Sequence, residues 1–295
     1  MNKLNTSFFF CVGAQKSGTT SLHDILRHHP EIYLPKAKEA HFFDKDERYT
    51  KGLDWWYSEF FKNHRNEKCT GTMTPEYLYY EEVPERIVEH LGTDLKIIIV
   101  LRNPIDRAYS HYLMSKRRGY EELTFAEAIE AEPERIKLGE FERDNYSYID
   151  RGRYSVQIER YTSLFKPDQL LFLSFENDIK QNIDQTIVRI QEFLGAKVVP
   201  LNTAIKSNVA SETSSKKVQQ FINESNPVKR QLKKIIPSQT RRVIKQKMSN
   251  WNSRKITSNN SLSEEERTHY YQKHFKQEPE LLKSLTGMDF SYWQD

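Results

Sequence analysis

The chain has 295 residues, 37% apolar and 12% aromatic, which is enough to bury a large core and excludes a mostly disordered protein. Its 45 lysines and arginines only slightly outnumber its 41 aspartates and glutamates, so the overall charge points to no nucleic-acid partner. Two cysteines, Cys11 and Cys69, are too few for a disulfide framework or a cysteine-based zinc site.

No apolar run approaches the length of a membrane span. The longest, Phe8 to Ala14 and Ile97 to Leu101, are far shorter than the ~20 residues that a transmembrane helix needs. Only seven residues precede Phe8, and Lys3 alone does not make the basic start of a signal peptide. We therefore expect a cytoplasmic protein without a transmembrane segment, while the sequence leaves its oligomeric state open.

Short apolar runs alternate with helical patterns along the chain. The apolar runs predict strands at residues 7–12, 68–72, 96–101 and 170–174. The helical patterns predict helices at 17–28, 104–118, 155–165 and 182–194, the last closed by Gly195. A further helix has Pro84 in its first turn, and a capping box of Ser263 with Glu266 begins another. The alternation predicts an α/β fold with a central parallel sheet and helices on both faces.

A glycine-containing loop, Gly13 to Thr20, joins the first predicted strand to the first predicted helix. Glycines allow successive amides to point inward, and the helix N-terminus adds partial positive charge, so the loop can hold phosphate oxygens. The Gly-x4-Gly spacing resembles a nucleotide-binding P-loop, but Thr19 stands where that motif has its lysine. The alternative is an ordinary strand-to-helix turn. The residues expected to bind the anion are Gln15, Lys16, Ser17, Gly18, Thr19 and Thr20.

A second candidate anion site follows the apolar run KIIIVL. Arg102 comes directly after this predicted strand, and ligands of open α/β sheets bind beyond the carboxyl ends of the strands. Ser110 lies two turns along the next helix, on the same side as Asn103 by helical spacing. A guanidinium and a hydroxyl suit a phosphate, although a strand-end arginine is also a common member of surface ion pairs. The two candidate sites form one nucleotide site only if Gly18 and Arg102 lie at the same edge of the sheet.

The motifs QKSGTT and LRNPIDRAYSHY, each after an apolar strand, resemble those of the sulfotransferase family. Members of that family use 3'-phosphoadenosine 5'-phosphosulfate (PAPS) as the sulfonate donor. The stretches PKAKEAHFFD (35–44) and TPEYL (74–78) are more similar to the glycosaminoglycan (heparan sulfate) branch and its bacterial relatives. The resemblance implies an enzyme that transfers a sulfonate to a hydroxyl, less readily to an amine, of a carbohydrate or small-molecule acceptor. It implies PAPS as co-substrate and no metal.

The resemblance also assigns roles. Lys16 would stabilise the departing phosphate, the loop would hold the 5'-phosphate, and Arg102 with Ser110 would hold the 3'-phosphate. Glu39 matches the presumed general base, and His41 would either orient Glu39 or be the base itself.

Three further positions remain open at this point. Tyr154 matches an element near the nucleotide or is a core residue. Lys216 is the nearest match to a basic residue that closes over the 3'-phosphate, although most charges of the basic segment 203–256 are expected on a solvated helical face. Met73 replaces a lysine of the glycosaminoglycan branch, a loss for which Lys36 or Lys38 would have to compensate.

We expect one domain over residues 1–295. Residues 7–200 would form the nucleotide-binding α/β core, and residues 201–295 a basic, helical part that closes over the site. Two other classes of function stay possible. A P-loop kinase or NTPase would need an acidic metal ligand where Arg102 stands, and a non-catalytic anion-binding protein would use the loop and the basic segment without turnover.

Overall fold

The computed structural model describes residues 4, 6–204, 211–213, 253–255 and 262–294. Contacts divide the chain into two compact units, which are described separately below. The first comprises residues 1–107, 150–207 and 266–295, and the second comprises residues 108–149 and 208–265. The single domain expected from the sequence stays a prediction.

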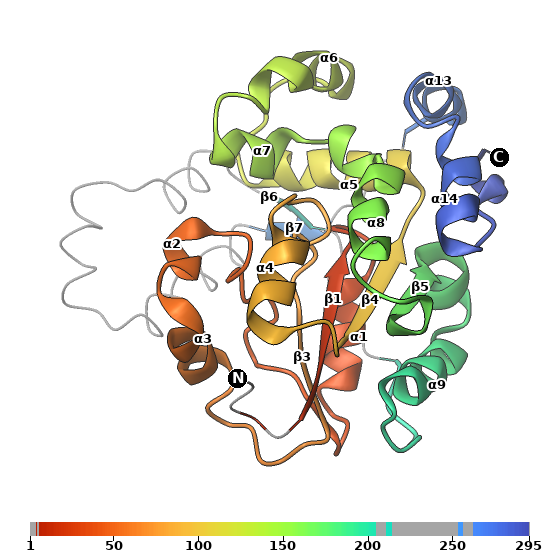
Figure 1. The fold of residues 1–295 in the computed structure, drawn as a ribbon. Coiled ribbons are helices and arrows are strands. Elements are labelled where there is room, and N and C mark those ends of the chain that lie inside the picture. The colour runs from red at the N-terminus through yellow and green to blue at the C-terminus, as the bar shows by residue number, and fades with distance from the viewer. Residues whose placement is uncertain (1–3, 5, 205–210, 214–252, 256–261, 295) are drawn as a thin grey trace. The chain divides into compact units, whose positions relative to one another are not determined.

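The first unit is built on a parallel sheet of five strands in the order β2-β3-β1-β4-β5 (Figure 1). The central strand β1 pairs with β3 on one side and with β4 on the other. The apolar runs of β1 and β4 are buried along nearly their whole length, as expected for strands covered on both faces. The strands are β1 Ser7–Gly13, β2 Ile32–Tyr33, β3 Cys69–Met73, β4 Lys96–Leu101 and β5 Leu170–Ser174.

Helices cover both faces of this sheet, which confirms the predicted fold class. On one face, α1 (Thr19–Leu26) and α9 (Ile183–Leu194) bury their apolar side chains against alternate residues of β1 and β4. On the other face, Phe8 and Phe10 of β1 contact Trp56 of α3 (Gly52–Phe60), with ring centroids 5.9 and 6.4 Å apart. α9 ends at Gly195, whose φ of 71° is the left-handed conformation expected of a glycine that ends a helix.

The C-terminal part of the first unit is helical, as predicted. α8 (Tyr154–Thr162) packs against α14 (Glu278–Thr286), where the backbone N–H and the hydroxyl of Ser155 both donate to the buried Glu278 carboxylate, at 3.0 and 2.9 Å. The remaining elements assigned to this unit wholly or in part are α2 Asp46–Tyr49, α4 Val83–Leu91, η1 Asp150–Gly152, α8 Tyr154–Thr162, η2 Pro167–Gln169, the π-helical η3 Phe175–Gln181, α13 Glu264–His274, α14 Glu278–Thr286 and η4 Ser291–Gln294.

The second unit holds most of α5 (Pro104–Arg117), together with α6 (Phe125–Arg135) and α7 (Glu140–Tyr146). One buried carboxylate of this unit, Glu121, accepts hydrogen bonds from Arg135 and Tyr148, both at 2.8 Å. Two short strands, β6 (Ser211–Thr213) and β7 (Ser253–Lys255), pair antiparallel.

The structure bears on two predictions, the helical basic segment and the absence of a transmembrane segment. β6 and β7 lie within the basic segment 203–256, so the expectation of a helix is wrong for these two pieces, and residues 205–210 and 214–252 of the segment lie outside the described residues. Among the helices that the structure describes, none has both the length and the apolar character that a membrane crossing requires.

Candidate active site

The phosphate loop has the form that the sequence predicted. β1 ends at Gly13 and α1 begins at Thr19. Gly18 has a φ of 84°, and a Cβ there would lie 3.0 Å from the side chains of Ile179 and Phe175, so both conformation and space favour glycine.

Hydrogen-bond donors gather at the N-terminus of α1. Among the described residues, no acceptor is found for the backbone N–H groups of Gly18, Thr19 and Thr20. The hydroxyl of Ser17 is fully buried and has no hydrogen-bond partner in the described part of the chain. Such a group of donors at a helix N-terminus is suited to a phosphate.

Arg102 lies against this loop. Its Nη1 donates to the backbone oxygen of Lys16 at 3.1 Å, and its guanidinium lies 4.8 Å from the centroid of the Phe175 ring. Its Nε is buried and has no hydrogen-bond partner in the described ranges. Tyr154, at the start of α8, is fully buried and donates its hydroxyl proton to the backbone oxygen of Arg102 at 3.0 Å. The loop and Arg102 therefore lie at the same edge of the sheet, as a single nucleotide site requires.

The turn after Arg102 is held by hydrogen bonds from three directions. Asn103 Oδ1 accepts from the N–H groups of Ile105 and Asp106, at 3.0 and 3.3 Å, which starts α5. The Asn103 N–H donates to Glu176 Oε1 at 2.9 Å, and its Nδ2 donates to the backbone oxygen of Trp293 at 2.9 Å. This turn is fixed by residues from distant parts of the sequence.

The nucleotide-binding roles of all these residues stay predictions, and two further predicted ligands are not placed beside Arg102. Ser110 lies on α5 in the second unit and is partly exposed, and its pairing with Arg102 stays a prediction. Lys216 lies outside the described residues.

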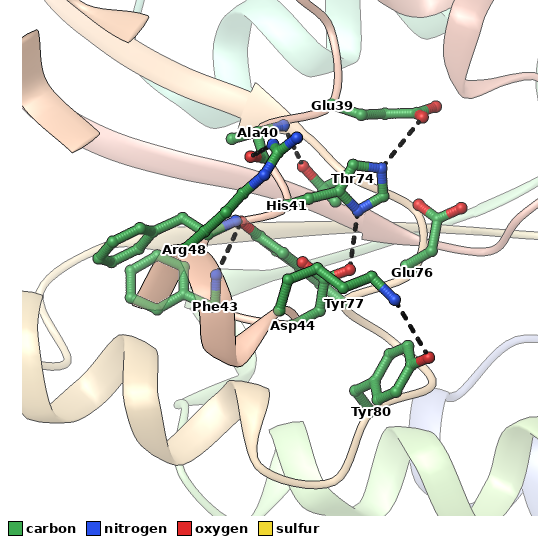
Figure 2. Close-up of polar contacts among 12 residues, drawn as sticks. Glu39, Ala40, His41, Phe43, Asp44, Arg48, Thr74, Glu76, Tyr77 and Tyr80 are labelled. Atoms are coloured by element: carbon green, nitrogen blue, oxygen red, sulfur yellow. Dashed lines mark hydrogen bonds and ion pairs between the residues drawn. The ribbon is translucent and has the colours of Figure 1, made fainter. Parts of the chain in front are cut away.

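Residues 35–44, which carry Glu39 and His41, are held in place by the motif TPEY. The N–H of Ala40 donates to the Thr74 hydroxyl at 3.1 Å. The N–H groups of Phe42 and Phe43 donate to the hydroxyl oxygen of Tyr77, at 3.1 and 3.3 Å (Figure 2). Tyr77 is fully buried, and it anchors this segment through these two hydrogen bonds.

His41 contacts Glu39 through one ring nitrogen and Asp44 through the other (Figure 2). His41 Nε2 lies 3.5 Å from Glu39 Oε2, and His41 Nδ1 lies 2.8 Å from Asp44 Oδ2. His41 has a φ of 46°, so the two side chains meet through a turn and not along an extended segment. The Lys38 ammonium lies 2.8 Å from Glu39 Oε1, where it supplies a positive charge to the site while Met73 is buried in the core.

The contacts among Glu39, His41 and their neighbours shift the pKa values of both side chains. Burial alone would raise the pKa of Glu39, but the hydrogen bond to His41 and the charge of Lys38 outweigh it and lower this pKa to about 2. Burial alone would lower the pKa of His41, but its hydrogen bonds to Asp44 and Glu39 and the charge of Glu76 raise it to about 10. Near neutral pH, Glu39 is therefore an ionised carboxylate and His41 is an imidazolium.

Glu76 is the residue that sequence reasoning did not single out, although it stands in the quoted motif TPEY. Its Oε1 accepts a hydrogen bond of 3.0 Å from Nε2 of Gln15 in the phosphate loop. Side-chain ligand atoms of Glu39, His41 and Glu76 all lie within 4.8 Å of one another. Glu76 therefore connects the phosphate loop to the Glu39–His41 pair. Asp44, which binds His41, is a second site residue that the sequence analysis quoted only as part of a motif.

Comparison with known proteins shows the family of the chain. Residues 7–284 match the sulfotransferase domain family, so the chain belongs to this family. It is 34% identical over 191 residues to heparan sulfate glucosamine 3-O-sulfotransferase 3B1 of Homo sapiens, a match that covers 63% of this chain and 45% of that protein. It is 30% identical over 161 residues to heparan sulfate glucosamine 3-O-sulfotransferase 5 of Homo sapiens, covering 54% of this chain and 44% of that protein. The chain thus spans about half the length of these curated relatives.

The fold also matches a solved bacterial structure. The crystal structure of a sulfotransferase from Alicyclobacillus acidocaldarius superposes with a TM-score of 0.67 at 27% identity, covering 99% of this chain and 100% of that chain. The resemblance to the heparan sulfate branch and to bacterial relatives is thereby confirmed.

Proposed function

We propose that the chain is a PAPS-dependent sulfotransferase that transfers a sulfonate to a hydroxyl, in preference to an amine, of a carbohydrate or small-molecule acceptor. The observation that carries the proposal is the contact of Arg102 with the phosphate loop beside the Glu39–His41 pair. A nucleotide with phosphates at both its 5' and 3' positions needs two phosphate-binding sites close together, and the phosphate loop and Arg102 would be these two sites.

The residues of the first unit fit PAPS. The Ser17 hydroxyl and the N–H groups at the start of α1 would bind the 5'-phosphosulfate, since these donors have no partner among the described residues. Arg102 would bind the 3'-phosphate, through a guanidinium whose position is fixed by Lys16 and Phe175. Ser110 and Lys216 would add to the 3'-phosphate site.

Sulfuryl transfer requires an in-line arrangement of the acceptor oxygen and the leaving oxygen, with positive charge where negative charge develops. The ionised Glu39 would accept the proton of the acceptor hydroxyl as the oxygen–sulfur bond forms. His41, held by Asp44, would orient Glu39. Lys16 would donate a proton or hydrogen bond to the phosphate oxygen from which the sulfonate departs, and adenosine 3',5'-bisphosphate would leave. An imidazolium cannot accept this proton, which supports Glu39 over His41 as the base.

Transfer from radioactive PAPS tests this function. Lys16→Ala should abolish transfer, whereas Lys62→Ala, which removes an exposed lysine elsewhere, should not change it. Full activity of Lys16→Ala would refute the assignment of Lys16.

The base is tested separately. Glu39→Gln should reduce turnover by at least ~100-fold without changing nucleotide affinity. An inactive His41→Ala together with an active Glu39→Gln would move the base to His41.

Ligand-induced thermal stabilisation separates this proposal from a kinase or NTPase. Adenosine 3',5'-bisphosphate should raise the melting temperature, and ATP with magnesium should not. Stabilisation by adenosine 3',5'-bisphosphate without transfer to any acceptor would favour a non-catalytic anion-binding protein.

A further inference from the structure

Trp293 is a fully buried residue of η4 that contacts the surroundings of Arg102 at three points. Its backbone oxygen accepts the hydrogen bond from Asn103 Nδ2, and its Nε1 donates to Glu176 Oε2 at 3.2 Å. The centroid of its ring lies 6.1 Å from that of the Tyr154 ring. All of these residues belong to the first unit. The function proposed above uses Arg102 and leaves Trp293 without a role.

Glu176 connects Trp293 to Arg102. Its Oε1 accepts a hydrogen bond of 2.9 Å from the N–H of Asn103, the residue that follows Arg102. The residue before Glu176 is Phe175, whose ring centroid lies 4.8 Å from the Arg102 guanidinium. Both oxygens of the Glu176 carboxylate are therefore bound, one by the chain next to Arg102 and the other by the indole of Trp293.

The partners of Arg102 show what this arrangement achieves. Arg102 has no acidic partner among the described residues, since Nη1 donates to the backbone oxygen of Lys16 and Nε is buried without a partner. A carboxylate and a guanidinium in neighbouring positions attract each other strongly, because charge-assisted hydrogen bonds between them are among the strongest in proteins. The hydrogen bonds from Trp293 and Asn103 occupy the oxygens of Glu176 and oppose that attraction.

We propose that Trp293 is a positioning residue, which holds the Glu176 carboxylate away from Arg102 and so keeps the guanidinium available to the 3'-phosphate of the nucleotide. This inference rests on the proposed role of Arg102. Since Trp293 is only 1% exposed, it acts through Glu176 and not by contact with the nucleotide. Loss of its N–H should therefore weaken binding of the 3'-phosphate and spare that of the 5'-phosphate, whose proposed donors lie at the start of α1.

Trp293→Phe tests the proposal, because it removes the indole N–H and keeps an aromatic ring beside Phe290 and Tyr154. In calorimetry on the full chain, adenosine 3',5'-bisphosphate should bind about 5- to 20-fold more weakly, and adenosine 5'-phosphate should change by less than about twofold. Trp55→Phe removes the N–H of a half-buried tryptophan on α3 and is the matched control, which should keep both affinities. Equal losses for the two nucleotides, or no loss in folded Trp293→Phe, would overturn the proposal.

A second substitution tests the route through Glu176. Glutamine at this position removes the charge that competes with the phosphate, and its amide oxygen can still accept from Asn103. The double variant Trp293→Phe/Glu176→Gln should therefore regain affinity for adenosine 3',5'-bisphosphate to within about twofold of wild type. A tryptophan that only packs in the core would show no such rescue, since the second substitution adds no packing. Affinity as low as in Trp293→Phe alone would overturn the proposal.

The wild-type chain allows a measurement that does not depend on the folding of a variant. If Trp293→Phe does not fold, as judged by circular dichroism, the indole N–H signal of Trp293 in an assigned NMR spectrum decides. Adenosine 3',5'-bisphosphate should shift this signal more than adenosine 5'-phosphate does, because only the 3'-phosphate places charge at Arg102. Equal shifts with both nucleotides, or none with either, would overturn the proposal.

Kinetics separate this inference from the proposed transfer activity. A selective loss of affinity for adenosine 3',5'-bisphosphate in Trp293→Phe, without transfer from radioactive PAPS by the wild-type chain, supports the positioning role and refutes the sulfotransferase. Transfer by the wild-type chain with an unchanged KM for PAPS in Trp293→Phe supports the sulfotransferase and overturns the positioning role.

Discussion

Replacing Asp44 with asparagine tests whether His41 is held as an imidazolium. The Asp44 side chain is fully buried, and its Oδ2 lies 2.8 Å from His41 Nδ1. Asparagine keeps an oxygen acceptor of the same shape and removes the charge. The pKa of His41 rises from its ordinary 6.5 to about 10, and since one pKa unit is worth about 1.4 kcal/mol, its partners together stabilise the protonated ring by about 5 kcal/mol.

Asp44 makes the shortest contact with the His41 ring, and Glu39 and Glu76 supply the rest of the stabilisation of its protonated form. We therefore expect Asp44→Asn to lower the free energy of unfolding by about 2–3 kcal/mol at pH 6. The control is Asp46→Asn, which removes an 81% exposed carboxylate that pairs with Arg86 and should cost less than about 1 kcal/mol.

The pH dependence of this loss is the sharper part of the test. Because folding raises the pKa of His41, its stabilisation is complete below pH 6.5, declines as the pH rises and is absent above about pH 10. The difference between wild type and Asp44→Asn should therefore shrink between urea denaturation at pH 6 and at pH 10. NMR titration of the His41 ring should give a lower pKa in the variant. A difference that is the same at both pH values, or below about 0.5 kcal/mol at pH 6, would refute the reasoning.

Two further predictions concern the nucleotide site. Tyr154→Phe removes the hydroxyl that donates to the Arg102 carbonyl oxygen in a fully buried place, so urea denaturation should show a loss of about 1–3 kcal/mol. Stability within about 0.3 kcal/mol of wild type would contradict this prediction. Arg102→Ala should weaken the binding of adenosine 3',5'-bisphosphate about 10- to 100-fold in calorimetry, and hardly change that of adenosine 5'-phosphate, which lacks the 3'-phosphate. Equal losses for both nucleotides would show that Arg102 only supports the loop.

The central strands could be predicted because polar residues or glycine mark both ends of each apolar run. KIIIVL gave β4 with the observed limits, since a continuous apolar run between polar residues has no other stable place than a buried strand. α9 was predicted to within one residue because Gly195 ends it. α6 was missed, although its capping box of Thr124 and Glu127 is a local signal that could have found it. β2, with only two residues, carries no pattern of its own.

The site could be predicted only in part. The phosphate loop and Arg102 follow strands, so their common edge follows from sheet topology. The sequence motif pairs Glu39 with His41, but the contact between their side chains depends on the positive φ of His41, which the sequence does not indicate. The position of Glu76 in the site depends on how residues 74–77 pack against residues 40–43. These segments are far apart in the sequence, so the spacing of residues within either one does not predict their contact.

The turn after β4 also bears on how the protein is made. Asn103 depends on the backbone oxygen of Trp293, and Trp293 Nε1 donates to Glu176, which in turn accepts from Asn103. A ribosome releases the N-terminal strands long before Trp293 is synthesised. On the nascent chain, the turn that follows Arg102 lacks this support, so we expect the proposed nucleotide site to be completed only after Trp293 has been synthesised.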